Sequence, residues 1–256
     1  MKDTLMPFQS ILWRKYTGWG VVVSLIVILA TFWVVRVRYE SRLRRQIWPV
    51  SIPAISIVTS PAAASVPTVM LLGDSRMAQW GLPRITHWRV VNAGTGGLTS
   101  GQILQVTPEL LDKFQPDVIV LQAGVNDLKF LGLHPEMAPT IISLVISNFT
   151  AIIGEGAKHQ CQVIVLETWP VGQPGWVRKL VWNGVIPGAV NQINTELWKL
   201  NTPEQGIRVV DLFNEAGLKS GANLYKDALH FVPEVYQRLT PALQKVLDAK
   251  STQTSL

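Results

Sequence analysis

The sequence predicts an α/β domain built on a parallel β-sheet and preceded by one membrane-spanning helix. Residues 16–35 carry no charged side chain, and beyond residue 66 short apolar runs alternate with longer amphipathic ones. The 256-residue chain is 48% hydrophobic and 16% charged, which excludes a disordered protein. Its single cysteine, Cys161, excludes an internal disulfide and any multi-cysteine metal site.

The first element is a transmembrane helix over about residues 16–35, within an N-terminal region of residues 1–48. A helix needs roughly 20 residues to cross about 30 Å of hydrocarbon. Interfacial aromatic residues flank this segment on both sides: Trp13, Tyr16, Trp19, Trp33, Tyr39 and Trp48. A cleaved signal peptide is the alternative. The basic segment 36–45 and the distant small residues 62–64 favour a retained single-pass anchor.

The positive charge of the chain lies almost entirely beside this anchor. Residues 1–48 hold eight of the 23 basic residues and two of the 17 acidic ones, which accounts for the net charge of +6. The rest of the chain is neutral and lacks the basic face that nucleic-acid binding requires, so no nucleic-acid partner is expected. Three basic residues before the span and five after it favour a cytoplasmic catalytic domain. The side stays open because long domains translocate despite such a bias.

Residues 49–66 are rich in Pro, Ala and Ser and are expected to form a linker. The domain itself is expected over residues 67–250, with a tail at 251–256. Five predicted strands are nearly continuous in apolar character, as strands covered on both faces should be: 68–72, 90–92, 118–122, 163–166 and 208–211. Four predicted helices lie between and after them: 101–114, 139–159, 189–200 and 233–248. This alternation predicts a five-stranded parallel sheet flanked by helices.

Polar loops follow four of these elements, and the carboxyl ends of parallel strands meet at one edge of a sheet. The loops are Gly73–Arg76, Asn92–Gly97, Gly124–Asp127 and Asp227–His230. A serine at a strand-to-helix turn presents its hydroxyl beside free N–H groups, and an asparagine carboxamide can donate to an oxyanion. Each of the first three loops is also ordinary cap or turn chemistry. A dinucleotide fingerprint in the glycine loop would need glycine where Thr99 stands.

His230 is the candidate base among four histidines, because it alone has an aspartate three residues before it. That spacing lets the carboxylate of Asp227 fold back onto the imidazole, fix its tautomer and stabilise the imidazolium. No G-x-S-x-G elbow occurs in the sequence, which separates the chain from the α/β-hydrolases.

These four motifs, in this order, resemble those of the SGNH (GDSL-like) hydrolase family, over about residues 66–248. The resemblance implies a flavodoxin-like three-layer fold with Ser75 as nucleophile and His230 as a base oriented by Asp227. It implies an oxyanion hole made by the N–H groups of Ser75 and Gly94 and the side chain of Asn126. Asp74 and Asp127, which flank these residues in the motifs, are taken as supporting groups. Two departures stand out, since Arg76 replaces the usual leucine and Ala228 a frequent glycine.

The expected activity is that of a membrane-anchored serine esterase that uses no metal and no organic cofactor. Two alternatives stay open: an acyltransferase with the same acyl-enzyme, and a non-catalytic anchored binding protein. The expected partners are a small-molecule, lipid or carbohydrate ester and, through the anchor, the lipid bilayer. Four residues are candidates for the substrate pocket: Arg76, Trp169, Trp176 and Trp182. The loop that carries the tryptophans is equally compatible with a local hydrophobic cluster. The identity of the ester and the oligomeric state stay open.

Overall fold

The computed structural model describes residues 7–49, 51, 54–61, 66–219 and 221–251. The chain divides into two compact units, Met1–Leu43 and Arg44–Leu256. The expected tail beyond residue 251 and residues 50, 52–53 and 62–65 of the expected linker lie outside the described residues.

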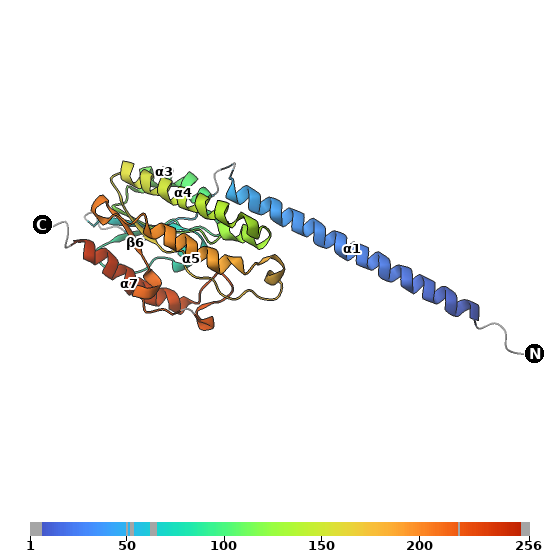
Figure 1. The fold of residues 1–256 in the computed structure, drawn as a ribbon. Coiled ribbons are helices and arrows are strands. Elements are labelled where there is room, and N and C mark those ends of the chain that lie inside the picture. The colour runs from blue at the N-terminus through green and yellow to red at the C-terminus, as the bar shows by residue number, and fades with distance from the viewer. Residues whose placement is uncertain (1–6, 50, 52–53, 62–65, 220, 252–256) are drawn as a thin grey trace, which may run out of the picture. The chain divides into compact units, whose positions relative to one another are not determined.

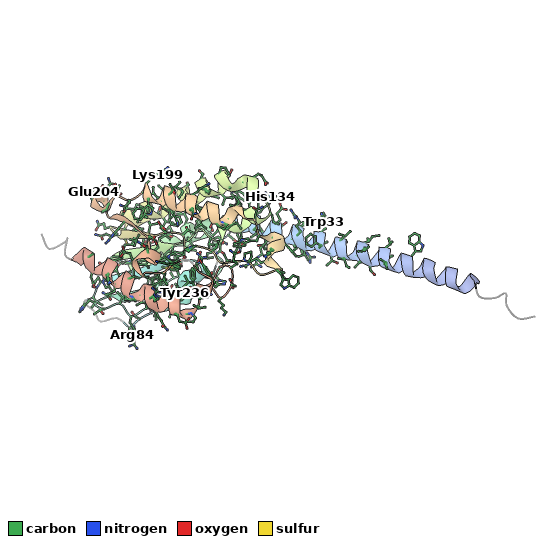
Figure 2. All side chains as sticks on the ribbon, turned by 60° about the horizontal axis from the view of Figure 1, so that its bottom comes forward. Trp33, Arg84, His134, Lys199, Glu204 and Tyr236 are labelled. Atoms are coloured by element: carbon green, nitrogen blue, oxygen red, sulfur yellow. The ribbon has the colours of Figure 1, made fainter. Side chains whose placement is uncertain are left out.

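Helix α1 is a single helix over Pro7–Ile47, longer at both ends than the span expected at residues 16–35. Its section Trp19–Ile47 contains a window with a mean hydropathy of 2.4 and is long and apolar enough to cross a membrane. The large apolar side chains between Trp19 and Val37, such as Trp33 in Figure 2, are exposed, whereas Leu43 and Ile47 near the end of the helix are buried. The segment Pro135–Lys158 passes the same test of length and composition, but it packs on the sheet as a core helix of the second unit.

The second unit contains a six-stranded sheet in the order β1-β3-β2-β4-β5-β6. The strands are β1 Val58–Thr59, β2 Thr68–Gly73, β3 Arg89–Asn92, β4 Val118–Gln122, β5 Gln162–Leu166 and β6 Ile207–Val210. Strands β2 to β6 are mutually parallel, which confirms the predicted five-stranded parallel sheet. The added strand β1 pairs antiparallel with β3 at the edge.

Helices cover both faces of this sheet and make a three-layer arrangement (Figure 1). On one face lie α3 (Ser100–Phe114), α4 (Ala138–Lys158) and α5 (Val185–Trp198), and on the other lies α7 (Pro233–Ser251). Alternate strand residues such as Val69, Leu71, Val118 and Val120 join the core beneath α7. The short helices α2 (Ser75–Trp80) and α6 (Leu212–Glu215) lie outside the four helix ranges predicted from the sequence. Both are too short to show an apolar periodicity.

The segment expected to be a linker contributes to the folded domain. Val58 and Thr59 extend the sheet by pairing with Asn92 and Val91. Two carbonyl groups upstream of β1 are also bound by the domain. The Gln46 carbonyl accepts the Thr99 hydroxyl at 2.6 Å, and the Pro49 carbonyl accepts the Gln105 amide at 3.1 Å. The linker interpretation is therefore wrong for residues 58–59, since a two-residue edge strand gives no periodic signal.

We expect a chain that begins at Val66 to be less stable than one that begins at Arg44. The shorter chain lacks β1, the two hydrogen bonds to Gln46 and Pro49, and the edge-on contact of Trp48 with Phe130. Each such hydrogen bond or aromatic contact contributes about 1 kcal/mol, so the free energy of unfolding should fall by about 2–3 kcal/mol. Urea unfolding of both chains measures the difference, and equal midpoints with equal slopes would show that this segment does not stabilise the domain.

The strand order reverses direction across the sheet at β2, which makes the ends of β2 and β4 the topological switch point. From β2 the chain moves to β3 on one side and then crosses to β4 on the other, the flavodoxin-like arrangement. Gly73 and Gln122, the last residues of β2 and β4, are register partners. The loops that begin at these residues therefore start side by side, and they carry Ser75 and Asn126. Ligands of such folds bind at this topological switch point.

Candidate active site

The structure brings the three predicted triad residues into one hydrogen-bonded chain. Ser75 Oγ lies 3.0 Å from His230 Nε2, and His230 Nδ1 lies 2.8 Å from Asp227 Oδ2. Ser75 is the first residue of α2, directly after β2, whereas Asp227 and His230 come from the loop before α7. The three side chains thus hold the geometry that proton transfer from a serine hydroxyl requires.

Asp227 is held by its own loop. Its Oδ1 accepts the backbone N–H groups of Leu229 at 2.8 Å and His230 at 3.0 Å, while Oδ2 faces the imidazole. Partial burial opposes ionisation, but the hydrogen bonds from the His230 ring and the two N–H groups outweigh it and lower the pKa of Asp227 to about 2. Asp227 is therefore a carboxylate at neutral pH and favours an imidazole that carries its proton on Nδ1.

The turn that presents Ser75 is fixed by Asp74, one of the two predicted supporting groups. Asp74 is the N-cap of α2, and its Oδ1 accepts the Arg76 N–H at 2.8 Å. Burial raises the pKa of Asp74, while the Arg76 charge opposes that shift. The cap sets the start of the helix, and so it sets where the Ser75 side chain emerges.

Two of the three expected oxyanion donors keep a hydrogen that could serve that role. The N–H of Ser75 lies in the first turn of α2, where the helix itself offers it no acceptor. Asn126 is buried at the end of the loop after β4, and its Nδ2 donates to the Leu98 carbonyl at 2.8 Å. A carboxamide nitrogen carries two hydrogens, so one remains for a developing oxyanion while the other holds the side chain in place.

The structure corrects the expectation for Gly94. Its N–H donates to the Asn92 side-chain oxygen at 2.8 Å, so this donor is already used within its own loop. Asn92 is anchored in turn by donating through Nδ2 to the Met77 carbonyl at 2.8 Å. A glycine is needed here for another reason, because a Cβ would collide with the backbone of Met77 and Ala78 in α2. Gly94 thus allows close packing of the loop onto the helix that carries Ser75.

We expect Asn126→Ala to lower kcat by about 10² with little change in KM, because the donor acts on charge that develops in the transition state. With the Gly94 N–H engaged by Asn92, we expect the Asn126 side chain to supply a larger share of that stabilisation. Steady-state kinetics on a soluble ester measure the effect. A rise in KM at unchanged kcat would mean that Asn126 binds the ground state instead.

Asp127, the other predicted supporting group, holds two neighbouring elements together. It is buried and accepts the Ser100 hydroxyl at 2.7 Å and the Ser100 N–H at 2.9 Å. Burial raises the pKa of Asp127 to about 6, against the lowering effect of these hydrogen bonds. Asn148 of α4 completes the network by donating to the Ser100 hydroxyl at 2.9 Å. Sequence reasoning missed Ser100 and Asn148, since neither lies in a motif.

Arg76 does not line the substrate pocket, contrary to the expectation, because it is fully buried. Its guanidinium donates to the carbonyls of Leu229 at 2.8 Å, Trp169 at 2.5 Å and Pro170 at 3.0 Å. Burial lowers the pKa of Arg76, and the Asp74 charge opposes that shift. Arg76 therefore ties the Ser75 turn to the His230 loop and to the segment after β5. An arginine in place of the usual leucine thus supplies hydrogen bonds that join these three segments.

The three candidate tryptophans separate in the structure. Trp169 is 1% exposed and packs against Trp80, Phe213 and Phe231 in the core, so the expectation that it lines a substrate pocket is wrong. Trp182 is half-buried beneath the Arg178 guanidinium, which lies 5.7 Å from its ring centroid. Trp176 is 82% exposed. A loop rich in Trp, Gly and Pro does not reveal which of its aromatic rings turn inward.

A hollow of about 490 Å³ is lined by residues close in sequence to the triad. Its lining is mixed aromatic and polar: Gln79, Trp80, Lys226, Phe231, Pro233, Tyr236 and Gln237. Gln79 is one helical turn after Ser75, and Phe231 directly follows His230.

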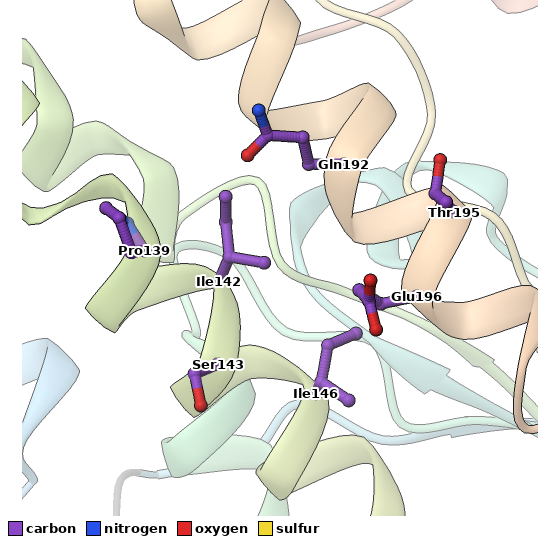
Figure 3. A pocket seen from close by; sticks show the side chains of 7 residues that line it. All are labelled: Pro139, Ile142, Ser143, Ile146, Gln192, Thr195 and Glu196. Carbon is purple, nitrogen blue, oxygen red and sulfur yellow. The ribbon is translucent and has the colours of Figure 1, made fainter.

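A second hollow, of about 410 Å³, lies between α4 and α5, with Ile142, Ile146 and Gln192 among its lining residues (Figure 3). That second hollow involves none of the predicted site residues. Among the described residues, no group of three or more His, Cys, Asp or Glu side chains is placed to hold a metal.

The fold and the site together define a flavodoxin-like α/β protein with a Ser–His–Asp constellation at its topological switch point. Residues 71–238 match the model of the GDSL-like Lipase/Acylhydrolase family, and the chain belongs to this family. The resemblance inferred from the four motifs is thus confirmed. An arylesterase from Vibrio mimicus is 28% identical over 103 residues, which cover 34% of this chain and 51% of that protein. The chain therefore spans about half the length of the curated relative that it matches.

Solved structures share the architecture at low sequence identity. A GDSL-like lipase from Bacteroides thetaiotaomicron superposes with a TM-score of 0.56 at 14% identity, covering 82% of this chain and 98% of that one. A catalytic mutant of an acetylxylan esterase from Geobacillus stearothermophilus gives a TM-score of 0.55 at 17% identity, covering 72% and 94%. These similarities confirm the predicted fold class.

Proposed function

We propose that this protein is a membrane-anchored serine hydrolase that cleaves an ester bond through an acyl-enzyme on Ser75. The observation that carries the proposal is the unbroken hydrogen-bond chain from Asp227 through His230 to Ser75. His230 Nε2 takes the hydroxyl proton as Ser75 Oγ attacks the ester carbonyl, and the resulting oxyanion faces the Ser75 N–H and Asn126 Nδ2. Membership of an acylhydrolase family and similarity to an arylesterase support the assignment.

We assign the alcohol part of the ester to the hollow lined by Phe231, the residue that follows His230. The base that removes the serine proton must afterwards deliver it to the leaving oxygen, so the leaving group lies on the His230 side of the attacked carbonyl. The lining of that hollow begins with Phe231 and includes Gln79 and Gln237, which offer both an apolar wall and amide groups. Water then attacks the acyl carbonyl with His230 as base and restores free Ser75.

The test is an ester panel assayed with the full-length protein. Short- and long-chain p-nitrophenyl esters and acetylated sugars report hydrolysis, and a fluorophosphonate probe reports an activated serine. Turnover together with probe labelling supports the proposal. Acyl transfer to an added alcohol in preference to water would assign an acyltransferase, and the absence of both labelling and turnover would overturn a catalytic role.

We also propose that α1 is a retained anchor. The apolar section Trp19–Ile47 and the interfacial tryptophans at its ends support this role. We expect the full-length protein to stay in the membrane pellet through an alkaline wash, and a chain that begins at Arg44 to be released. Recovery of a mature protein that begins after Ala64 would instead identify a cleaved signal peptide.

A further inference from the structure

The segment between β5 and α5 carries an exposed apolar tip at residues 176–180. Trp176, Val177 and Leu180 are 82%, 57% and 58% exposed, and Lys179 is exposed between them. Such a cluster of large apolar side chains has a cost in water unless a partner covers it. Tryptophan, aliphatic side chains and cations together are typical of segments that bind an anionic membrane surface.

The segment that carries the tip contacts the loop Asp227–His230 at two places. Arg178 Nη1 lies 3.9 Å from Asp227 Oδ1. The N–H of Gly172, at the start of the same segment, donates to the Ala228 carbonyl at 2.9 Å. A surface that binds the tip is therefore brought close to the Ser75–His230 pair.

A series of contacts within the second unit links the tip to residues 44–48, where that unit begins. Gly132 ends the turn η1 (Asp127–Gly132) and packs so closely on Val181 that a Cβ would collide with the Val181 carbonyl. Phe130 of the same turn meets Trp48 edge-on with ring centroids 5.8 Å apart, and the Arg44 guanidinium lies 5.2 Å from the Phe130 centroid. The turn η1 thus joins the tip to residues 44–48.

The short stretch of chain between Val35 and Arg44 keeps residues 44–48 near the proposed membrane span. The uncharged segment ends at Val35, and Arg44 follows nine residues later. Nine residues reach at most about 30 Å even when fully extended. The exposed side chains of Arg45 and Trp48 add a cation and an interfacial aromatic at the same place.

We propose that residues 176–180 bind the surface of an anionic lipid bilayer, the bilayer in which α1 is anchored. Trp176, Val177 and Leu180 enter the headgroup region, while Lys179 contacts lipid phosphates. The inference rests on the proposed function in that α1 is taken as the anchor. It goes beyond that function by naming a second membrane contact, made by the unit that carries the triad.

The test measures lipid contact and needs no catalysis. Full-length protein in vesicles of phosphatidylcholine and phosphatidylglycerol carries one fluorophore on an introduced cysteine, in a Cys161→Ser background. The positions compared are Val177→Cys at the tip, Ile26→Cys within the apolar segment, and Glu204→Cys. Glu204, labelled in Figure 2, is an exposed residue that precedes β6 and so lies at the opposite edge of the parallel sheet. Nitroxide-bearing lipids quench fluorophores that touch the bilayer.

We expect quenching at positions 177 and 26 and none at 204. Leu180→Glu should weaken tip binding about tenfold, since it removes one apolar side chain from the interface, whereas Leu180→Phe should preserve it. Quenching at 26 with position 177 behaving like 204 would overturn the inference and leave the anchor intact. Lack of quenching at 26 would overturn the anchor and the inference with it. Equal quenching at all three positions would show non-specific adsorption and also overturn the inference. Because no arm measures turnover, these outcomes are independent of whether Ser75 is catalytic.

Discussion

Ser75→Ala abolishes ester hydrolysis and fluorophosphonate labelling while the domain stays folded; this is the largest effect that we expect. The substitution removes the proposed nucleophile, Oγ, which lies 3.0 Å from His230 Nε2. By analogy with other serine hydrolases, kcat should fall on the order of 10⁵–10⁶. Stability should change by no more than about 0.5 kcal/mol, because the side chain is only part-buried and fills no core position.

Ser143→Ala is the matched control. Ser143 is an exposed serine on α4 and belongs to none of the loops that carry the triad, so labelling and turnover should be unchanged. Probe labelling that persists in Ser75→Ala would remove Ser75 from the role of nucleophile. A loss of labelling accompanied by a lower unfolding midpoint would point to a damaged fold, which circular dichroism and urea unfolding would detect.

The residues that the sequence could identify are those whose chemistry depends on local spacing. Asp227 and His230 are three residues apart, and one turn of chain is enough to close their hydrogen bond. The five parallel strands are continuous apolar runs, so their positions follow from burial on both faces. The Ser75 turn and the Asn126 loop start side by side because parallel strands end at one edge.

The features that the sequence could not identify depend on contacts between distant segments. Arg76 is a charged residue beside the nucleophile, and only the three carbonyls of Leu229, Trp169 and Pro170 explain why it is buried. The Gly94 N–H depends on the orientation of the Asn92 side chain, which no spacing rule supplies. The strand β1 has two residues, too few for any period, and it exists because β3 offers an open edge.

Asp227→Asn is expected to lower kcat by roughly 10²–10³ while the fold is kept. In the wild type, the N–H groups of Leu229 and His230 donate to Asp227 Oδ1. The side-chain oxygen of Asn can still accept both of these hydrogen bonds. Its amide group would then donate to His230 Nδ1, which places the ring proton on Nε2. A protonated Nε2 cannot accept the proton of Ser75. The neutral amide also supplies no charge to stabilise the imidazolium. The loss should be smaller than the drop of about 10⁴ known for a buried triad, because the Asp227 side chain is 48% exposed.

The same substitution should change how stability depends on pH. The hydrogen bonds that lower the pKa of Asp227 to about 2, from 3.8, favour the ionised carboxylate in the folded state. The stabilisation they give is complete above about pH 4 and is lost as the pH falls toward 2. Urea unfolding at pH 5 and at pH 3 should therefore show a smaller loss for Asp227→Asn than for the wild type. Solvent exposure of the side chain makes this difference modest.

Asp211→Asn separates the role of the triad from a general effect of removing a carboxylate. Asp211 also follows a strand and caps a short helix, with Oδ1 accepting the Asn214 N–H at 3.0 Å, and it belongs to no part of the triad. We expect kcat within about twofold of wild type for Asp211→Asn, as for substitutions away from the chemistry. Turnover near that of the wild type in Asp227→Asn as well would leave Ser75 and His230 as a dyad. The aspartate would then be a turn residue that holds Leu229 and His230, and another group would have to orient the base.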